Sequence, residues 1–225
     1  MESKEIVFVV PCYNETLPLT RTIKSLLKYG EVVFVNDGSK KSLNIAPEIY
    51  KEIKYLHHVI NRGQGAALET GFEFIRLYFP AASYIITFDA DGQHSLQDAL
   101  KMVSKARQGY DVVLGSRFIG SNSEIRRFKR IILKSFAKSY SFFSGHKVTD
   151  RHFGLRVFSK KFIEKNSLKT SNFEHADEIL NLVVKNNWKF CEFPCTVLYT
   201  KYSIKKGQPI INGINILFDR ATKKL

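Results

Sequence analysis

Short apolar runs and helix-spaced apolar positions alternate along the first 116 residues. The runs are rich in β-branched residues, as buried strands are, and they cover residues 6–10, 32–35, 55–60, 84–88 and 112–114. Between them apolar residues recur at helical spacing, which predicts helices over residues 16–28, 64–79 and 95–107. Strands that alternate with helices indicate an α/β fold with an open, mostly parallel sheet.

The alternation stops after Arg117. Residues 124–143 have the pattern of a basic amphipathic helix, and residues 208–225 predict a second amphipathic helix. Between them the pattern predicts a short strand at 155–158, a helix at 174–185 and an apolar stretch at 188–199. No linker or internal repeat divides the 225 residues. We therefore expect a single domain whose character changes at residue 117.

Polar residues collect where the predicted strands end. They occupy residues 11–15, 36–39, 61–63, 89–91 and 115–117. In open α/β sheets, ligands bind beyond the carboxyl ends of the strands. The sequence therefore predicts a binding site at this edge of the sheet.

Asp89 and Asp91 are the most informative residues of that edge. They directly follow the apolar run at 84–88, and two carboxylates at the end of a buried strand are costly unless they are compensated. Hard carboxylate oxygens suit Mg²⁺ or Mn²⁺, and a phosphate-bearing substrate can supply further ligands. The alternative is a helix N-cap, since residues 91–95 precede a predicted helix and N-caps favour Asp and Ser, here Asp91 and Ser95.

Other strand-end residues also have two interpretations. Asp37 can accept a hydrogen bond from a ribose or a base, or it can simply form a turn with Gly38. Residues 61–67 contain two glycines. They can let a phosphate approach the backbone N–H groups at the start of the helix, or they can let that helix pack closely against the sheet. Arg117 can bind a diphosphate, or it can neutralise Asp89 and Asp91 as an ion pair.

Composition points to an anionic partner. The formal net charge is +14, and residues 117–165 contain 13 Lys or Arg against 3 Asp or Glu. Nucleic acid, anionic lipid and a phosphorylated substrate all fit this charge, but no nucleic-acid recognition element is recognisable. No apolar run approaches a membrane span, and three cysteines without metal-ligand spacing fit a reducing cytoplasm.

Taken together, the motifs resemble the family 2 glycosyltransferases with the GT-A fold, and most closely the dolichyl- or polyprenyl-phosphate sugar synthases. The segments that carry the resemblance are residues 11–15 (PCYNE), 35–39 (VNDGS), 61–67 (NRGQGAA), 89–93 (DADGQ), 115–118 (GSRF) and 149–156 (TDRHFGLR). Two features depart from relatives. Residues 201–208 keep a glycine and positive charge but not the R-x-x-G-x-S-K pattern, and the Q-x-x-R-W motif of processive synthases is absent.

The resemblance implies roles for individual residues. Asp89, Asp91 and Gln93 would hold Mg²⁺ or Mn²⁺, and Arg117 would face the donor phosphates. The nucleotide pocket would contain Pro11, Tyr13, Glu15 and Asp37, within a nucleotide-binding half at residues 1–116. The acceptor-binding, membrane-facing half would cover residues 117–225. Arg127 and Arg130 would bind the acceptor phosphate, and Lys206 is the C-terminal lysine expected at the diphosphate.

These roles predict an inverting, metal-dependent transfer of a sugar from a UDP- or GDP-sugar to a polyprenyl phosphate. A phosphate acceptor needs no general base. A saccharide hydroxyl, the alternative acceptor, would need Asp177 or Glu178, whose other interpretation is a favourable helix N-terminus. A non-catalytic nucleotide-sugar-binding relative is a further alternative. We expect a cytoplasmic protein held at an anionic membrane surface by its basic helices or by a small membrane partner protein.

Overall fold

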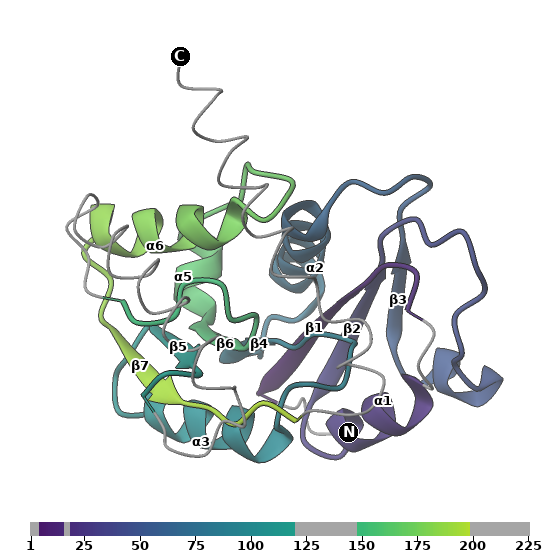
Figure 1. Cartoon of the computed structure of the whole chain (residues 1–225), viewed down its shortest axis with the longest axis horizontal. Helices are drawn as coiled ribbons and strands as arrows, with labels where there is room; N and C mark the ends of the chain where they lie inside the picture. The colour runs from purple at the N-terminus through teal and green to yellow at the C-terminus, as the bar shows by residue number, and fades with distance from the viewer. Residues whose placement is uncertain (1–4, 16–18, 120–147, 199–225) are drawn as a thin grey trace.

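The computed structural model describes residues 5–15, 19–119 and 148–198, and these residues form one seven-stranded sheet with helices on both faces (Figure 1). The strand order across the sheet is β3-β2-β1-β4-β6-β5-β7. The strands are β1 (Ile6–Cys12), β2 (Glu31–Asn36), β3 (Lys54–His57), β4 (Tyr84–Thr87), β5 (Val112–Ser116), β6 (Arg156–Ser159) and β7 (Phe190–Pro194).

All strand pairs except those of β6 are parallel. β6 lies between β4 and β5 and runs antiparallel to both, so that Val157 faces Ile86 on one side and Val113 on the other. The parallel strands therefore end at the same edge of the sheet, as the sequence predicted. The antiparallel β6 enters from that edge, which brings the residues just before it next to the end of β4.

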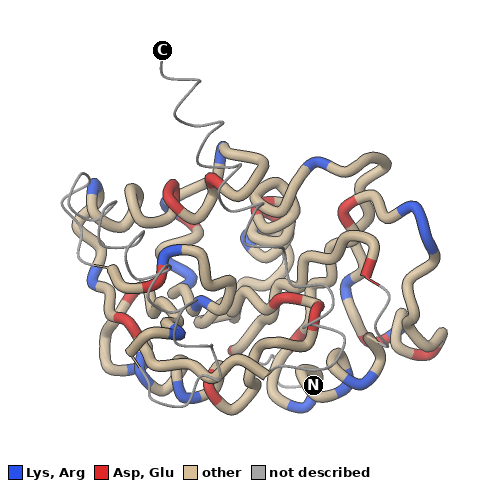
Figure 2. The backbone as a smooth tube through the Cα atoms, viewed as in Figure 1, with Lys and Arg blue, Asp and Glu red and all other residues tan. Residues whose placement is uncertain are grey.

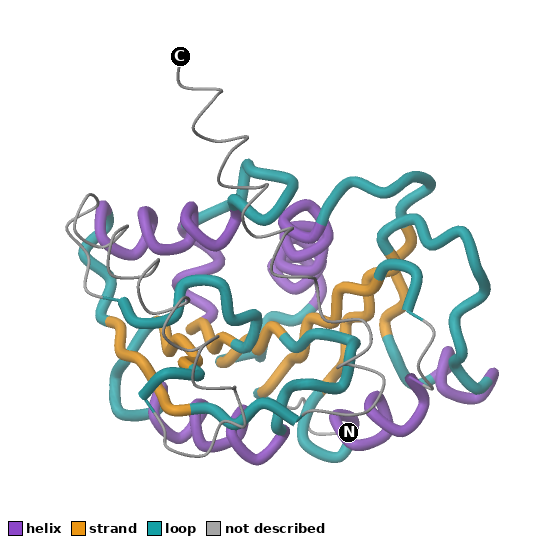
Figure 3. Tube along the Cα trace, in the orientation of Figure 1, coloured by secondary structure: helices purple, strands orange, loops and turns teal. Residues whose placement is uncertain are grey.

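The helices form two layers, visible above and below the sheet in Figures 1 and 3. The helical segments are α1 (Leu19–Leu27), the 3₁₀ helix η1 (Pro47–Lys51), α2 (Gln64–Tyr78), α3 (Leu96–Ala106), α5 (Lys160–Lys165) and α6 (His175–Lys185). One core cluster joins α1, η1 and α3 to one face, where Phe8 and Phe34 lie. The other joins α2, α5 and α6 to the opposite face, where Val7 and Val9 lie. Burial on both faces is the reason that β1 and β2 are almost entirely apolar.

The structure corrects two details of the predicted elements. The third strand ends at His57 instead of residue 60, and Val59 and Ile60 are 92% and 70% exposed. Gly38 lies against the backbone of Ile60, where the chain has left the sheet. The short helix α5 was not predicted, and Ser159 caps it by accepting a hydrogen bond from the Phe162 N–H at 3.2 Å.

Both predicted amphipathic helices, at 124–143 and 208–225, lie outside the described residues. In the part of the chain that is described, no helix has the length and apolar character needed to cross a bilayer.

Candidate active site

Asp89 leaves β4 inside a set of hydrogen-bonding groups that fix its position. Its N–H donates to Nδ1 of His94 at 3.1 Å, and its Oδ1 accepts from Nε2 of Gln64 on α2 at 3.1 Å. Because Nδ1 of His94 accepts, its proton is on Nε2, which lies 3.3 Å from Oδ2 of Asp89. A helix on one side and the loop after β4 on the other therefore hold the same carboxylate.

Asp91 completes the carboxylate pair. Its Oδ1 accepts from the Gln93 N–H at 3.0 Å, across a turn in which Gly92 has a φ of 73°. Asp91 does not cap the following helix, because Ser95 does so by accepting from the Asp98 N–H at 3.2 Å. Residues 91–95 thus do contain the predicted N-cap, but the capping residue is Ser95, and the Asp91 carboxylate lies at the edge of the sheet near Asp89.

Both carboxylates hold protons more tightly than an ordinary aspartate does. Burial raises the pKa of Asp89 to about 6, although Arg156 and Arg117 act in the opposite direction. Burial and the neighbouring Asp89 raise the pKa of Asp91. Burial also lowers the pKa of His94 to about 4, so this imidazole is neutral at physiological pH. Because the charge of Asp89 disfavours that of Asp91, a cation at this pair of carboxylates is stabilising.

The strand β6 brings Gly154 directly against Asp89. A Cβ atom on Gly154 would lie 2.2 Å from Oδ2 of Asp89 and 2.8 Å from its Cγ. The carbonyl of Gly154 accepts from the hydroxyl of Thr87 at 2.6 Å, which joins this segment to β4. The absence of a side chain at residue 154 therefore provides the space that the Asp89 carboxylate occupies.

Arg117 makes an ion pair, but its partner is Asp150 and not Asp89 or Asp91. Its Nε and Nη2 donate to the two carboxylate oxygens of Asp150 at 2.6 and 2.8 Å, and its backbone N–H donates to Oδ2 at 3.0 Å. The guanidinium lies over the rings of Phe118 and Phe153, 5.5 and 5.3 Å from their centroids. It nevertheless lowers the pKa of Asp89, so its charge acts on the site. A role at the donor phosphates stays a prediction.

Two further arginines lie under α6 among buried acidic groups. Nη1 of Arg151 is 3.2 Å from Oδ1 of Asp177, and Nη2 of Arg156 donates to the Arg151 carbonyl at 2.9 Å. Both arginines are buried, and burial lowers the pKa of Arg156 to about 10, against the opposing effect of Asp89. Figure 2 shows acidic and basic positions interleaved in this part of the molecule. The positive charges of Arg156 and Arg117 thus act on Asp89 before any ligand arrives.

The structure gives Asp37 the role of organising a loop. It is 3% exposed, and its two carboxylate oxygens accept from ring Nδ1 of His58 at 2.7 Å, Nδ2 of Asn61 at 2.8 Å and the N–H groups of Arg62 and Gly63 at 2.9 Å each. These four contacts occupy about as many acceptor positions as a carboxylate has. The Asp37 carboxylate therefore holds the loop at 58–63, a role different from the predicted turn with Gly38, while a contact with nucleotide stays a prediction.

The glycines before α2 serve close packing. The Gly65 N–H donates to the carbonyl of Ser171 at 2.8 Å, and the Ala66 N–H points to the same oxygen at 3.3 Å. A Cβ on Gly65 would lie 2.2 Å from the Thr170 carbonyl. A phosphate at this helix N-terminus is therefore the wrong interpretation, because the chain at 170–171 occupies the position.

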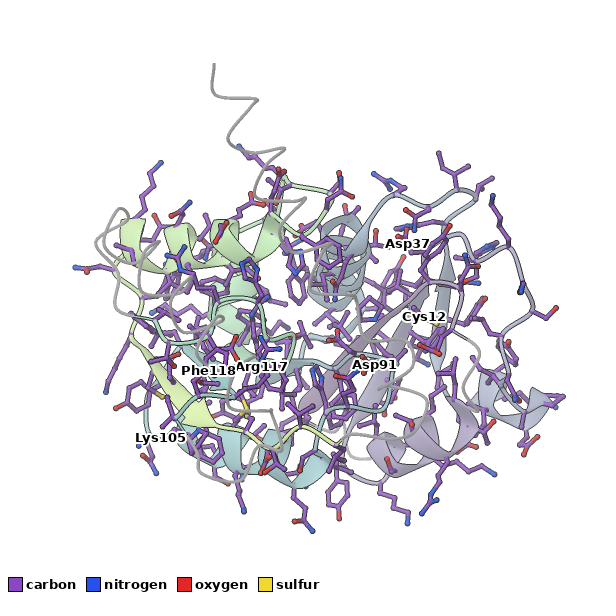
Figure 4. The ribbon with its side chains drawn as sticks, viewed as in Figure 1. Cys12, Asp37, Asp91, Lys105, Arg117 and Phe118 are labelled. Atoms are coloured by element: carbon purple, nitrogen blue, oxygen red, sulfur yellow. The ribbon has the colours of Figure 1, made fainter. Side chains whose placement is uncertain are left out.

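The remaining residues of the predicted nucleotide pocket follow β1. Pro11 is buried, Tyr13 is 44% exposed, and Glu15 is buried close enough to raise the pKa of Asp91, as the smallest of its causes. The loops after β1 and β2 are tied together, because the Asn14 N–H donates to the Ser39 hydroxyl at 2.9 Å. In Figure 4, Asp91 lies near the middle of the molecule, with Arg117 to its left and Asp37 above it.

Asp177 and Glu178 lie in the first turn of α6, and protein groups already hold both carboxylates. Asp177 pairs with Arg151. Glu178 accepts from the N–H groups of Lys169 and Thr170 at 2.8 and 2.9 Å and from the Thr170 hydroxyl at 2.5 Å. Burial raises the pKa of Glu178, but these hydrogen bonds outweigh it and the pKa is lowered. A carboxylate that acts as a general base at neutral pH needs a raised pKa instead.

Replacing Glu178 with alanine should therefore weaken the fold and leave sugar transfer nearly unchanged. Loss of its hydrogen bonds to residues 169 and 170 should reduce the free energy of unfolding by about 1–3 kcal/mol. Removal of a general base would instead slow turnover by about 10²–10⁴-fold. Urea unfolding and the turnover rate of Glu178→Ala distinguish these results, with Glu178→Gln as the variant that keeps an acceptor oxygen.

The described residues fit a divalent metal held jointly by protein and substrate. Within them, no group of three or more His, Cys, Asp and Glu side chains forms a complete metal cage. The crowded pair of Asp89 and Asp91 still supplies the hard oxygens that Mg²⁺ and Mn²⁺ prefer, and such ions often take their remaining ligands from phosphate and water. Gln93, the third predicted ligand, belongs to the same turn. The predicted phosphate-binding residues Arg127, Arg130 and Lys206 lie outside the described residues.

Comparison with known proteins identifies the family. Residues 7–166 match the model of glycosyl transferase family 2. An uncharacterised protein of Methanocaldococcus jannaschii is 37% identical over 98% of this chain and 93% of its own length. The UDP-N-acetylglucosamine–dolichyl-phosphate N-acetylglucosaminyltransferase of Methanococcus voltae is 29% identical over 97% of this chain and 95% of its own.

Among solved structures, the glucosyl-3-phosphoglycerate synthase of Mycobacterium tuberculosis in complex with Mn²⁺, UDP and phosphoglyceric acid matches with a TM-score of 0.67. It is 12% identical, over 93% of this chain and 73% of that one. This likeness confirms the predicted GT-A fold. The chain is a glycosyltransferase of family 2, and its relatives support the predicted resemblance to the polyprenyl-phosphate sugar synthases of that family.

Proposed function

We propose that this glycosyltransferase transfers a sugar, with inversion, from a nucleotide diphosphate sugar to a polyprenyl phosphate, and that it requires Mg²⁺ or Mn²⁺. The observation that carries the proposal is the pair Asp89 and Asp91, held at the carboxyl edge of the sheet with raised pKa values and with arginines close by. Relatives of the chain that are named for dolichyl- or polyprenyl-phosphate substrates support the acceptor class.

The residues of the site divide the work between donor and metal. Asp89, Asp91 and Gln93 would hold the metal, which would supply positive charge to the departing diphosphate. His94 and Gln64 keep Asp89 in place, so its carboxylate needs little reorganisation. Pro11, Tyr13, Glu15 and Asp37 would surround the nucleotide. Arg117, with Asp150 fixing its orientation, would add a second cation at the phosphates.

The state of α6 supports a phosphate acceptor over a hydroxyl. A phosphate monoester is an anion and attacks without a base, whereas a hydroxyl needs one. Asp177 and Glu178 were the predicted bases, and both carboxylates are engaged by protein donors. Arg127 and Arg130 would receive the acceptor phosphate. Lys206 would face the diphosphate. The segment that contains Lys206 follows Leu198, whose N–H donates to the Gln93 carbonyl.

The acceptor is a lipid, so the protein would work at the cytoplasmic surface of a membrane. The basic segment at 124–143 and the C-terminal segment at 208–225 would bind anionic headgroups, with each Lys or Arg near the surface contributing about 1 kcal/mol. A small membrane protein would be the other means of recruitment.

The test is an incubation of the full chain with Mn²⁺, a panel of UDP- and GDP-sugars and a short polyprenyl phosphate. The acceptor is offered both in detergent and in anionic vesicles. We expect metal-dependent formation of a lipid-linked sugar from one donor, with the opposite anomeric configuration, and faster turnover on vesicles at low salt. Transfer to saccharide hydroxyls alone, or no turnover with any donor, would overturn the proposal.

A further inference from the structure

Residues 195–198, which we call the tether, run from the end of β7 to the loop that carries Asp91 and Gln93. Their N–H groups donate in turn to three separate segments. Cys195 donates to the Ser116 carbonyl at 2.8 Å, Thr196 to Oδ2 of Asp98 at 2.8 Å, and Leu198 to the Gln93 carbonyl at 2.9 Å. Val197 forms an antiparallel bridge with His94. The tether thus lies against the metal-binding loop.

Asp98 supplies the side-chain oxygen that accepts from the backbone of the tether. It lies in the first turn of α3 and is only 9% exposed, and its own N–H donates to the Ser95 hydroxyl at 3.2 Å. A carboxylate in the first turn of a helix is favourable even when it faces solvent. The helix does not need the Asp98 carboxylate to be buried. This carboxylate instead contacts the Thr196 N–H, 98 positions further along the chain.

The tether and the Asp89 contacts meet at His94. Its backbone bridges to Val197, while its ring accepts from the Asp89 N–H and contacts the Phe88 and Phe153 rings. A shift of the tether would therefore move the loop at 91–94, and Asp91 and Gln93 with it. A displacement of about 1 Å in a catalytic group is enough to change rates greatly.

We propose that Asp98 is a positioning residue for the donor diphosphate. By holding the N–H of Thr196, it fixes the tether against the loop at 91–94 and so fixes Asp91 and Gln93. This inference rests on the proposed function, because it assigns a task in binding the donor of that reaction.

The test compares Asp98→Ala with a matched variant, Asp111→Ala. Asp111 has the same kind of contact at the other end of β7, where its Oδ2 accepts from the Lys189 N–H at 3.2 Å. Both variants should lose stability. Only Asp98→Ala should show faster hydrogen exchange at the amides of Thr196 and Leu198. Only it should weaken the binding of UDP or GDP with Mn²⁺, by about tenfold for the loss of one charge-assisted hydrogen bond.

Asp98→Asn keeps an oxygen that can accept from Thr196, so it should recover most of the nucleotide affinity. Equal nucleotide affinity in Asp98→Ala and wild type, or equal weakening by Asp111→Ala, would overturn the inference. A wild-type protein that binds neither nucleotide with Mn²⁺ would instead overturn the proposed function. In that case, an unchanged hydrogen-exchange rate of the Leu198 amide in Asp98→Ala would separately refute the role of Asp98 in holding the tether.

Discussion

Replacing Asp89 with asparagine should abolish sugar transfer and, at the same time, stabilise the metal-free protein at pH 8. Burial raises the pKa of Asp89 in the folded protein to about 6, against an ordinary value of 3.8. The folded state therefore holds this proton more tightly than the unfolded state does. Stability is lost as the pH rises from about 4 through about 6, and above that range the charged carboxylate costs the fold about 3 kcal/mol.

Asparagine has nearly the same shape and no charge, so it avoids this cost. The net gain should be smaller, about 1–2 kcal/mol, because the variant also loses a negative neighbour of Arg156 and an acceptor for His94. Activity should fall by at least about 10²–10³-fold, the usual effect of losing one group that stabilises developing charge. Calorimetric unfolding at pH 5 and pH 8 in EDTA, together with turnover in Mn²⁺, measures both effects.

Asp111→Asn, at the opposite edge of the sheet, controls for the replacement of an aspartate as such. The gain of Asp89→Asn should be largest at pH 8, smaller at pH 5, where only part of the penalty has developed, and absent below about pH 4, where Asp89 is protonated in both the folded and the unfolded protein. Addition of Mn²⁺ should reverse the order of stability, because only the carboxylate binds the ion well. A variant that is less stable than wild type at pH 8 without metal would show that burial does not penalise this charge.

The general position of the site could be predicted from sequence because it depends on local patterns. Apolar runs of strand length located β1, β2, β4 and β5, and the polar residues that end them had to meet at one edge of a parallel sheet. Asp89 and Asp91 were placed correctly for this reason. The strand β6 was also found, although nothing in its composition predicted that it runs antiparallel between β4 and β5.

The partners of the site residues could not be predicted, because they come from distant parts of the chain. Asp150 lies 33 positions from Arg117, and Gln64 lies 25 positions from Asp89. Asp37 shows the same limit in another form. Its turn chemistry was visible in the sequence, but the ring of His58 that shares its carboxylate was not. Only the three-dimensional arrangement separates a carboxylate available to ligands from one already occupied by protein.

Replacing Gly154 with alanine should give the second large effect, a loss of about 10²-fold in kcat/KM with little change in stability. The new methyl group would lie 2.2 Å from Oδ2 of Asp89, so the carboxylate would have to move or rotate away. Alanine also restricts the unfolded chain, which is worth about 0.4–1 kcal/mol and offsets part of the strain. Mn²⁺ affinity and steady-state kinetics of Gly154→Ala measure the displacement.

Gly71→Ala is the matched control, because a Cβ there would lie 2.5 Å from Cγ1 of Val9 in the core between α2 and β1. Overpacking at that position should cost about 1–3 kcal/mol of stability and leave the turnover of the folded fraction unchanged. The two variants thus separate crowding in the core from crowding at the carboxylate. If Gly154→Ala binds Mn²⁺ and turns over as wild type does, Asp89 adapts without cost, and the position of its carboxylate is not set by the chain that passes over it.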